Sequence, residues 1–142
     1  MAEALLAHHG GAQFISNSAG SFPTGEVHPL SLTTLKARGI PTTGYRSKSW
    51  DEFTGQPIDI VITVCDAAAG ESCPIFPGKP LKAHWGVPDP AKFQGTEAET
   101  RIEFARVCDI LEKRIKALIR LPLNGISNEE LQHKLHAIGE LS

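Results

Sequence analysis

A run of β-branched residues near the middle of the chain constrains its fold more than any other stretch. Residues 58–64 read Ile-Asp-Ile-Val-Ile-Thr-Val, and Cys65 follows directly. A short and nearly continuous apolar run of this kind predicts a buried strand of a parallel sheet. In α/β proteins the chemistry gathers where such strands end. The thiol of Cys65 is therefore the first candidate for a functional group.

Small residues separate Cys65 from a second cysteine. Residues 66–72 read Asp-Ala-Ala-Ala-Gly-Glu-Ser, and Cys73 follows. A backbone this rich in alanine and glycine can rearrange to bring the two Cα atoms within the roughly 4.4–6.8 Å that a disulfide requires. Two interpretations stay open. The cysteines form a redox pair, or Cys65 packs in the core as a small hydrophobe.

A zinc site is disfavoured by the spacing of the candidate ligands. Structural zinc usually binds cysteines two to four residues apart, and the histidines at 8, 9, 28, 84, 133 and 136 supply no matching second pair. The third cysteine, Cys108, lies on the apolar face of a predicted helix, which favours core packing. We predict no metal and no other cofactor.

Helical and strand patterns alternate along the first half of the chain. Residues 1–10 and 29–39 predict short helices, with Gly10 as a left-handed stop and Gly39 ending the second. Residues 14–19 predict a strand, and residues 50–53 a short helical turn at most.

The second half predicts one more strand, at residues 81–85, and then two helices. Thr96–Glu99 and Ser127–Glu130 have the capping-box pattern, so we expect helices to begin there. The first runs to just before Pro122 and the second closes at Gly139. The apolar face of the longer helix is spaced three and four residues apart: Ile102, Ala105, Cys108, Leu111, Ile115 and Leu118.

This order of elements predicts an α/β fold, a three-layer sandwich with a short parallel sheet. A length of 142 residues fits one domain. The formal net charge of −2, without a basic cluster, gives no reason to expect nucleic acid as a partner. No apolar run approaches the roughly 20 residues of a membrane span. Without a recognisable signal peptide, three cysteines indicate a reducing compartment, and we expect the cytoplasm.

One carboxylate stands out beyond the cysteines. Asp89 lies between two prolines in Val-Pro-Asp-Pro-Ala, shortly after the predicted strand at 81–85. A carboxyl on a rigid loop there can act as a general acid toward a leaving oxygen. The alternative is ordinary turn chemistry, which aspartate beside proline also serves. His84 and Trp85 are interpreted as a strand end and its packing.

The two-cysteine stretch, with the later His-Trp-Gly-Val-Pro-Asp-Pro-Ala, resembles the thioredoxin-coupled arsenate reductases. These share the fold of the low-molecular-weight protein tyrosine phosphatases. Met-Ala-Glu-Ala-Leu-Leu at residues 1–6, Asn-Ser-Ala-Gly at 17–20 and His-Pro at 28–29 resemble the same family in the same order. The resemblance covers nearly all of residues 1–121, so we predict that domain at 1–121 and a C-terminal helical extension at 122–142.

The resemblance implies a cysteine relay. A cysteine in a C-x5-R loop attacks arsenate, a second thiol attacks the adduct and releases arsenite, and a third closes a disulfide that thioredoxin reduces. Cys65 matches the second thiol, Cys73 the third, and Asp89 the acid that assists the first step. Thioredoxin is thus the implied partner and arsenate the implied substrate. Lys48 replaces an acidic cation ligand of some relatives, so we predict no potassium site.

The C-x5-R spacing occurs in the 142 residues only at Cys108–Arg114, within a predicted helix, where no loop of amides can cradle an anion. The residues six positions after Cys65, Cys73 and Cys108 are Glu71, Lys79 and Arg114, and the last pair lies within a predicted helix. In the resembling family this loop and the first, central strand come just before the Met-Ala-Glu helix. We therefore expect that strand to be missing and the chain as printed to be inactive.

Two classes of function remain. One is an arsenate reductase whose recorded start lies too far downstream. The other is a truncated, non-catalytic remnant that serves as a thiol binding module for arsenite or thioredoxin. A protein tyrosine phosphatase homologue is disfavoured, since that chemistry needs no second and third thiol and equally requires the C-x5-R loop.

Overall fold

The predicted parallel sheet is present. In the computed structural model, which describes residues 1–19, 27–53, 55–64 and 80–141, β1 (Ile60–Thr63) pairs in parallel with β2 (Leu81–His84). Ile60 stands opposite Leu81, and Thr63 opposite His84. Within the described residues these two strands form the whole sheet. The α/β class and the short parallel sheet are thus confirmed.

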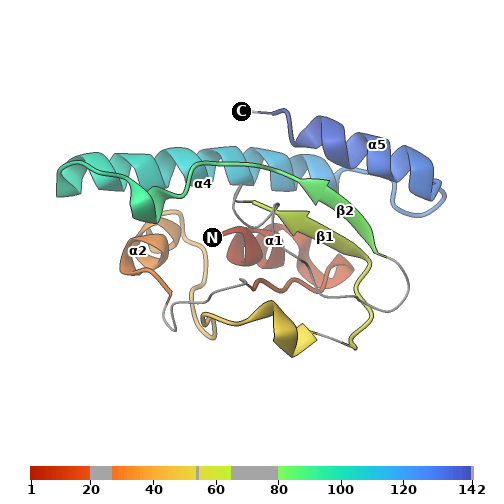
Figure 1. The fold of residues 1–142 in the computed structure, drawn as a ribbon, viewed down its shortest axis with the longest axis horizontal. Helices are drawn as coiled ribbons and strands as arrows, with labels where there is room; N and C mark the ends of the chain where they lie inside the picture. Colours follow the sequence, from red (N-terminus) through yellow and green to blue (C-terminus); the bar gives the residue numbers. More distant parts are fainter. Residues whose placement is uncertain (20–26, 54, 65–79, 142) are drawn as a thin grey trace.

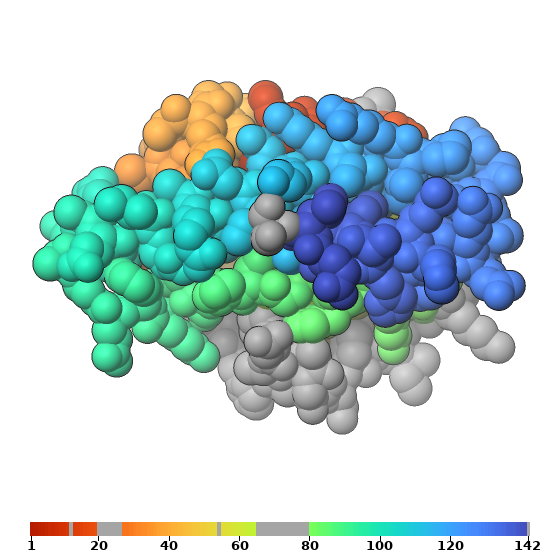
Figure 2. All heavy atoms as spheres, turned by 90° about the horizontal axis from the view of Figure 1, so that it is seen from above, coloured from red at the N-terminus to blue at the C-terminus, as the bar shows by residue number. Residues whose placement is uncertain are grey.

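Each helix predicted from the sequence is found. They are α1 (Ala2–Gly10), α2 (Pro29–Ala37), α4 (Glu97–Ile119) and α5 (Asn128–Ile138), with 3₁₀ turns η1 (Gly11–Gln13), η2 (Trp50–Phe53) and η3 (Pro90–Lys92). In Figure 1, α4 runs along the molecule, while α1 and α2 pack against it and α5 packs against β2. Figure 2 shows α4 and α5 lying side by side on one face.

None of the helices in the described parts of the chain is both long and apolar enough to cross a membrane.

The core lies along one face of α4. Its buried side chains recur at helical spacing: Phe104, Val107, Cys108, Leu111, Arg114, Ile115 and Leu118. Val107, Cys108, Leu111, Ile115 and Leu118 form one core cluster with Leu5 of α1, Leu35 of α2 and Leu135 of α5. The predicted face was wrong at its N-terminal end, because Ile102 is 68% exposed. Ile102 lies six residues before Cys108, which turns it about 120° away from the buried stripe at 3.6 residues per turn.

The two glycines predicted to stop helices α1 and α2 differ. Gly39 has a positive φ of +72°. Its amide donates to the Lys36 carbonyl, and the Ile40 amide donates to the Leu35 carbonyl. These two hydrogen bonds form a Schellman motif. Gly10 is a wrong prediction: it stays right-handed within α1, and Gly11 takes the positive φ of +54°. A Cβ on Gly10 would lie 2.7 Å from the Phe14 ring, so close approach explains glycine at position 10.

Both predicted serine and threonine caps form. Thr96 and Glu99 make the full reciprocal capping box at the start of α4. At α5 the structure gives only the serine half of the predicted box, in which the Ser127 hydroxyl accepts from the Glu130 amide at 3.1 Å. Gly139 ends α5 as predicted, but in a right-handed conformation; a Cβ there would lie 3.0 Å from the His84 carbonyl oxygen. Glycine at this position lets α5 approach β2.

The predicted strand at residues 14–19 is wrong. These residues follow η1 without regular secondary structure, and Ile15 is 95% exposed. A strand needs a hydrogen-bonded neighbour and, on at least one face, a surface to bury. Within the described structure no strand pairs with residues 14–19, although Phe14 packs against the core, so β propensity alone did not produce a strand.

Leu135 offers a test of the core. Its side chain is fully buried where α5 meets the rest of the molecule. We expect Leu135→Ala to lower the free energy of unfolding by about 2–5 kcal/mol, because it removes buried methyl groups and leaves a cavity. Urea denaturation followed by circular dichroism measures this. Ile102→Ala is the control, and an equal loss from the exposed Ile102 would contradict the packing described.

Candidate functional site

The two strands leave the sheet side by side at their carboxyl ends. Beyond β1 and β2 the Trp85 amide donates to the Thr63 carbonyl at 2.7 Å, and the Val87 amide donates to the Val64 carbonyl at 2.9 Å. Val64 immediately precedes Cys65, and Val87 lies two residues before Asp89. Hydrogen bonding therefore joins the backbone that leads to Cys65 with the backbone that leads to Asp89.

Cys65 and Cys73 lie outside the described residues. Their pairing and their surroundings therefore stay predictions. What the structure does fix is the entry to the segment, through the hydrogen bond that the carbonyl of Val64 accepts.

Asp89 makes the turn that the sequence suggested for it, and its role as a general acid stays a prediction. The side chain is exposed, and its Oδ1 accepts a hydrogen bond from the Ala91 amide at 3.0 Å as the N-cap of η3. This bond is turn chemistry, yet it also holds the carboxyl in one orientation. Pro88 and Pro90 fix the φ angle on either side of it. The result is a solvent-accessible carboxyl on a stiff loop.

His84 and Trp85 behave as predicted. Nδ1 of His84 lies 2.7 Å from Oγ1 of Thr63, its partner across the parallel pair. Trp85 is 2% exposed, and its indole Nε1 donates to the Leu135 carbonyl at 2.9 Å. Trp85 is thus a core residue that ties β2 to α5.

Arg114 is a residue whose role the sequence reasoning missed. It is 5% exposed and lies on the buried face of α4. Nη1 donates to the Trp85 carbonyl at 2.9 Å and to the Gly86 carbonyl at 3.4 Å, and Nε donates to the Leu141 carbonyl at 2.8 Å. Burial lowers the pKa of the guanidinium, an effect opposed by Glu140. The spacing could have indicated that Arg114 is buried, because position 114 falls three residues after Leu111 and four before Leu118, on the apolar stripe.

Cys108 packs in the core as predicted. Its side chain is fully buried, and burial raises the pKa of the thiol above its usual value. A thiol must be deprotonated to act as a nucleophile. Cys108 is therefore unsuited to thiol exchange in the folded protein, which leaves Cys65 and Cys73 as the candidates.

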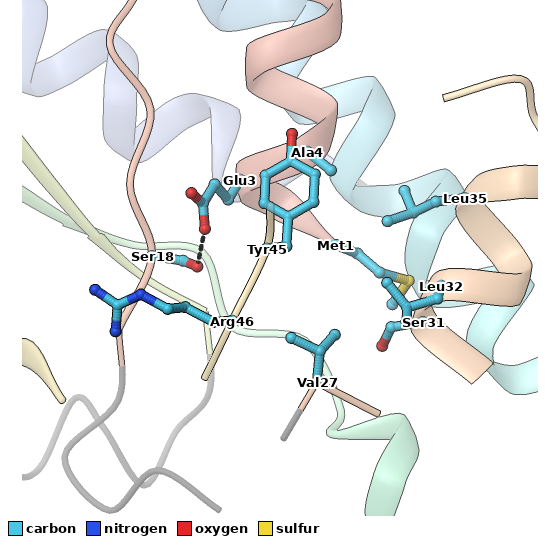
Figure 3. Close-up of a pocket in the computed structure, with 10 residues that line it drawn as sticks. All are labelled: Met1, Glu3, Ala4, Ser18, Val27, Ser31, Leu32, Leu35, Tyr45 and Arg46. Carbon is cyan, nitrogen blue, oxygen red and sulfur yellow. Dashed lines mark hydrogen bonds between the residues drawn. The ribbon is translucent and has the colours of Figure 1, made fainter. Parts of the chain in front are cut away.

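A polar cluster of Glu3, Ser18 and Lys48 lies at the first turn of α1. The ammonium of Lys48, which is 8% exposed, pairs with Oε1 of Glu3 at 3.2 Å, and the Ser18 hydroxyl donates to the same oxygen. Figure 3 shows Glu3 and Ser18 beside Tyr45 and Arg46 in a small pocket. Among the described residues, Asp89 does not line this pocket. The absence of a potassium site, which we inferred from Lys48, stays a prediction.

Comparison with known proteins decides the family. Residues 1–136 match the low molecular weight phosphotyrosine protein phosphatases. The chain belongs to this family. The resemblance stated from the sequence is confirmed, and the match extends into α5.

Within this family the similar proteins are arsenate reductases. The arsenate reductase of Bacillus licheniformis is 36% identical over 116 residues, which are 82% of each chain, and that of Bacillus subtilis (strain 168) is 34% identical over 116 residues with the same coverage. The arsenate reductase of Halalkalibacterium halodurans is 39% identical over 90 residues, which are 63% of this chain and 64% of the relative.

A solved structure agrees with these sequence matches. It is the thioredoxin-dependent arsenate reductase of Corynebacterium glutamicum, at a TM-score of 0.53 and 32% sequence identity. The match covers 81% of this chain and 54% of that chain. The present chain therefore spans about half of the solved protein.

The Glu3–Lys48 pair yields a prediction about stability. We expect Lys48→Met to lower the free energy of unfolding by about 1–3 kcal/mol, because it leaves a largely buried carboxylate without its cation. The double variant Lys48→Met/Glu3→Gln should lose less than the sum of the two single variants. Thermal or urea unfolding of the four proteins measures the coupling.

An exposed ion pair in the same region provides the control. Arg46 and Glu52 form a bidentate pair at the surface. Exposed pairs of this kind contribute little to stability because solvent screens them, so Arg46→Met should have a small effect. Equal losses for Lys48→Met and Arg46→Met would contradict a special role for the buried pair.

Proposed function

We propose that this chain carries the thiol-exchange part of an arsenate reductase. In this proposal Cys65 and Cys73 form a disulfide that thioredoxin reduces, and Asp89 is the general acid. The supporting observation is the hydrogen bond from the Val87 amide to the Val64 carbonyl, which joins the chain entering Cys65 to the loop of Asp89. The similarity to arsenate reductases over 82% of the chain supplies the substrate class.

The proposed chemistry transfers two electrons. A first cysteine attacks arsenate, forms a sulfur–arsenic bond, and expels water after Asp89 supplies a proton to the leaving oxygen. The Cys65 thiolate then attacks the first sulfur, the sulfur–arsenic bond breaks with its electron pair remaining on arsenic, and arsenite leaves. The Cys73 thiolate attacks Cys65 and releases the first cysteine as a thiolate. Arsenic is reduced from As(V) to As(III), and two thiols are oxidised to the Cys65–Cys73 disulfide.

The first cysteine is not supplied by these 142 residues, whose only C-x5-R spacing, from Cys108 to Arg114, lies within α4. The buried thiol of Cys108 cannot replace it, because the α4 backbone amides around it are engaged in the helix and offer no oxyanion cradle. We propose that arsenate reduction requires a C-x5-R segment joined to this chain. The thiol pair itself needs only a reductant such as thioredoxin, which fits the cytoplasm as its compartment.

The Asp89 loop suits proton delivery. A general acid must hold its carboxyl where the leaving group can reach it, and it must exchange its proton with solvent between turnovers. Asp89 is exposed, and the Ala91 amide fixes the orientation of one carboxyl oxygen. This arrangement leaves the carboxyl accessible to a substrate at the carboxyl edge of the sheet.

The disulfide can be tested in the 142-residue polypeptide. We expect mild oxidation with diamide to remove two hydrogens from the protein and to link Cys65 to Cys73, which peptide mapping by mass spectrometry identifies. Thioredoxin with its reductase and NADPH should restore both thiols.

Three single variants sharpen the disulfide test. Cys65→Ser and Cys73→Ser should each prevent the intramolecular link, whereas Cys108→Ala should leave it unchanged because that thiol is buried. A disulfide that includes Cys108, or none at all in the unmodified chain, would contradict the proposed thiol pair.

The arsenate step has its own test. We expect the 142-residue polypeptide to show no arsenate-dependent NADPH oxidation in the thioredoxin-coupled assay, and a chimaera preceded by the C-x5-R segment of a related arsenate reductase to show turnover. In the chimaera Cys65→Ser should block arsenite release. Cys73→Ser should stop thioredoxin-supported turnover, while a small thiol still rescues it. Turnover by the 142 residues alone would overturn the requirement for the C-x5-R segment.

A further inference from the structure

We propose that Arg114 is a positioning residue that holds the Trp85–Asp89 segment in place, and that α5 and the residues after it are part of this support. The inference rests on the proposed function only for the meaning of Asp89 as an acid. The positioning itself follows from contacts among described residues.

The guanidinium of Arg114 is satisfied by main-chain oxygen atoms. Its recorded acceptors are the carbonyls of Trp85, Gly86 and Leu141, at 2.9, 3.4 and 2.8 Å. The planar fork of an arginine presents donors in fixed directions, so one side chain can hold two segments in a set relation. Here it joins the segment after β2 to the residue that follows α5.

A buried charge at this position is not explained by core packing. Arg114 lies on the stripe that elsewhere carries Leu111, Ile115 and Leu118. Desolvating a cation is costly, and an apolar side chain of similar volume often packs as stably or better. A role in fixing the geometry of the neighbouring backbone gives a physical reason for arginine at this site.

The path from Arg114 to Asp89 is short and stiff. Trp85 and Gly86 are four and three residues before Asp89, and the Val87 amide between them and Asp89 is held by the Val64 carbonyl. The next residues, Pro88 to Pro90, have their φ angles restricted at both prolines. A backbone set at residues 85–87 therefore leaves Asp89 little rotational freedom.

The α5 helix also contacts this segment. The Trp85 indole donates to the Leu135 carbonyl at 2.9 Å, and Gln132 Nε2 donates to the Lys82 carbonyl at 2.5 Å. Gly139 lies so close to the His84 carbonyl that a Cβ would be only 3.0 Å from it. With the Leu141 carbonyl on Arg114, the C-terminal part of the chain contacts residues 82–86 at several points.

Amide hydrogen exchange and NMR of the 142-residue chain test the proposal. The probes are the Val87 amide and the Trp85 indole N–H, and the reference is the Leu81 amide, which donates to the Asp59 carbonyl at the opposite end of the sheet. We expect Arg114→Met to reduce protection of the two probes about tenfold more than that of Leu81, because carbonyls held by the guanidinium are released. Arg114→Lys should recover part of the loss.

A direct readout for Asp89 is the chemical shift of the Ala91 amide proton, which the Asp89 carboxylate accepts. Arg114→Met should move this shift toward its position in Asp89→Ala. The matched control is Leu35→Ala, a core variant of α2 that should lower global stability without moving the Ala91 signal.

Two results would overturn the proposal. One is an equal loss of protection at Val87, Trp85 and Leu81, which shows a purely structural role. The other is an Ala91 shift that stays unchanged in Arg114→Met. Neither measurement uses arsenate or thioredoxin, so a failure of the proposed function appears in the turnover and disulfide assays and leaves this test intact.

Discussion

The packing of α4 against everything else is the interaction on which this structure depends. One continuous stripe, from Phe104 to Leu118, contributes the largest share of the buried core and reaches α1, α2, α5 and the residues after β2. A two-stranded sheet is marginally stable by itself. Within the described residues the short β1–β2 pair therefore depends on neighbouring helices to bury its residues, and α4 and α5 hold the backbone at its carboxyl edge.

Because α4 packs beside the end of β2, Arg114 on its buried stripe can hold the backbone that follows this strand. The carboxyl edge of the sheet is where a parallel α/β fold places its chemistry. In this chain the segment leaving β2 is held by Arg114 from α4 and by the Leu135 carbonyl from α5. Long-range contacts between the last third of the chain and residues 82–86 thus decide how the Asp89 loop is presented.

The sequence predicted local structure well wherever local signals decide the outcome. The capping box at Thr96, the Schellman glycine at position 39 and the β-branched run before Cys65 each specify their element through neighbours a few residues away. The strand expected at residues 14–19 failed because pairing depends on a partner distant in sequence. The stripe on α4 was predicted wrongly at its start, where Phe104 is buried and Ile102, two residues earlier, is exposed.

In the candidate site, too, some features could be predicted from the sequence and others could not. The motif around Cys65, Cys73 and Asp89 was predicted from residue types and their order alone, and its chemistry stays a prediction. The acceptors of Arg114 could not be predicted from the chain alone, since all three are main-chain carbonyls and leave no mark in the side-chain pattern.

Because Arg114 binds main-chain carbonyls, related sequences can vary at the residues that supply them. Residues 86 and 141 are free to change their side chains as far as Arg114 is concerned, while an insertion or deletion that shifts either carbonyl is not tolerated. Across homologues, spacing should therefore be kept more strictly than identity at these two positions.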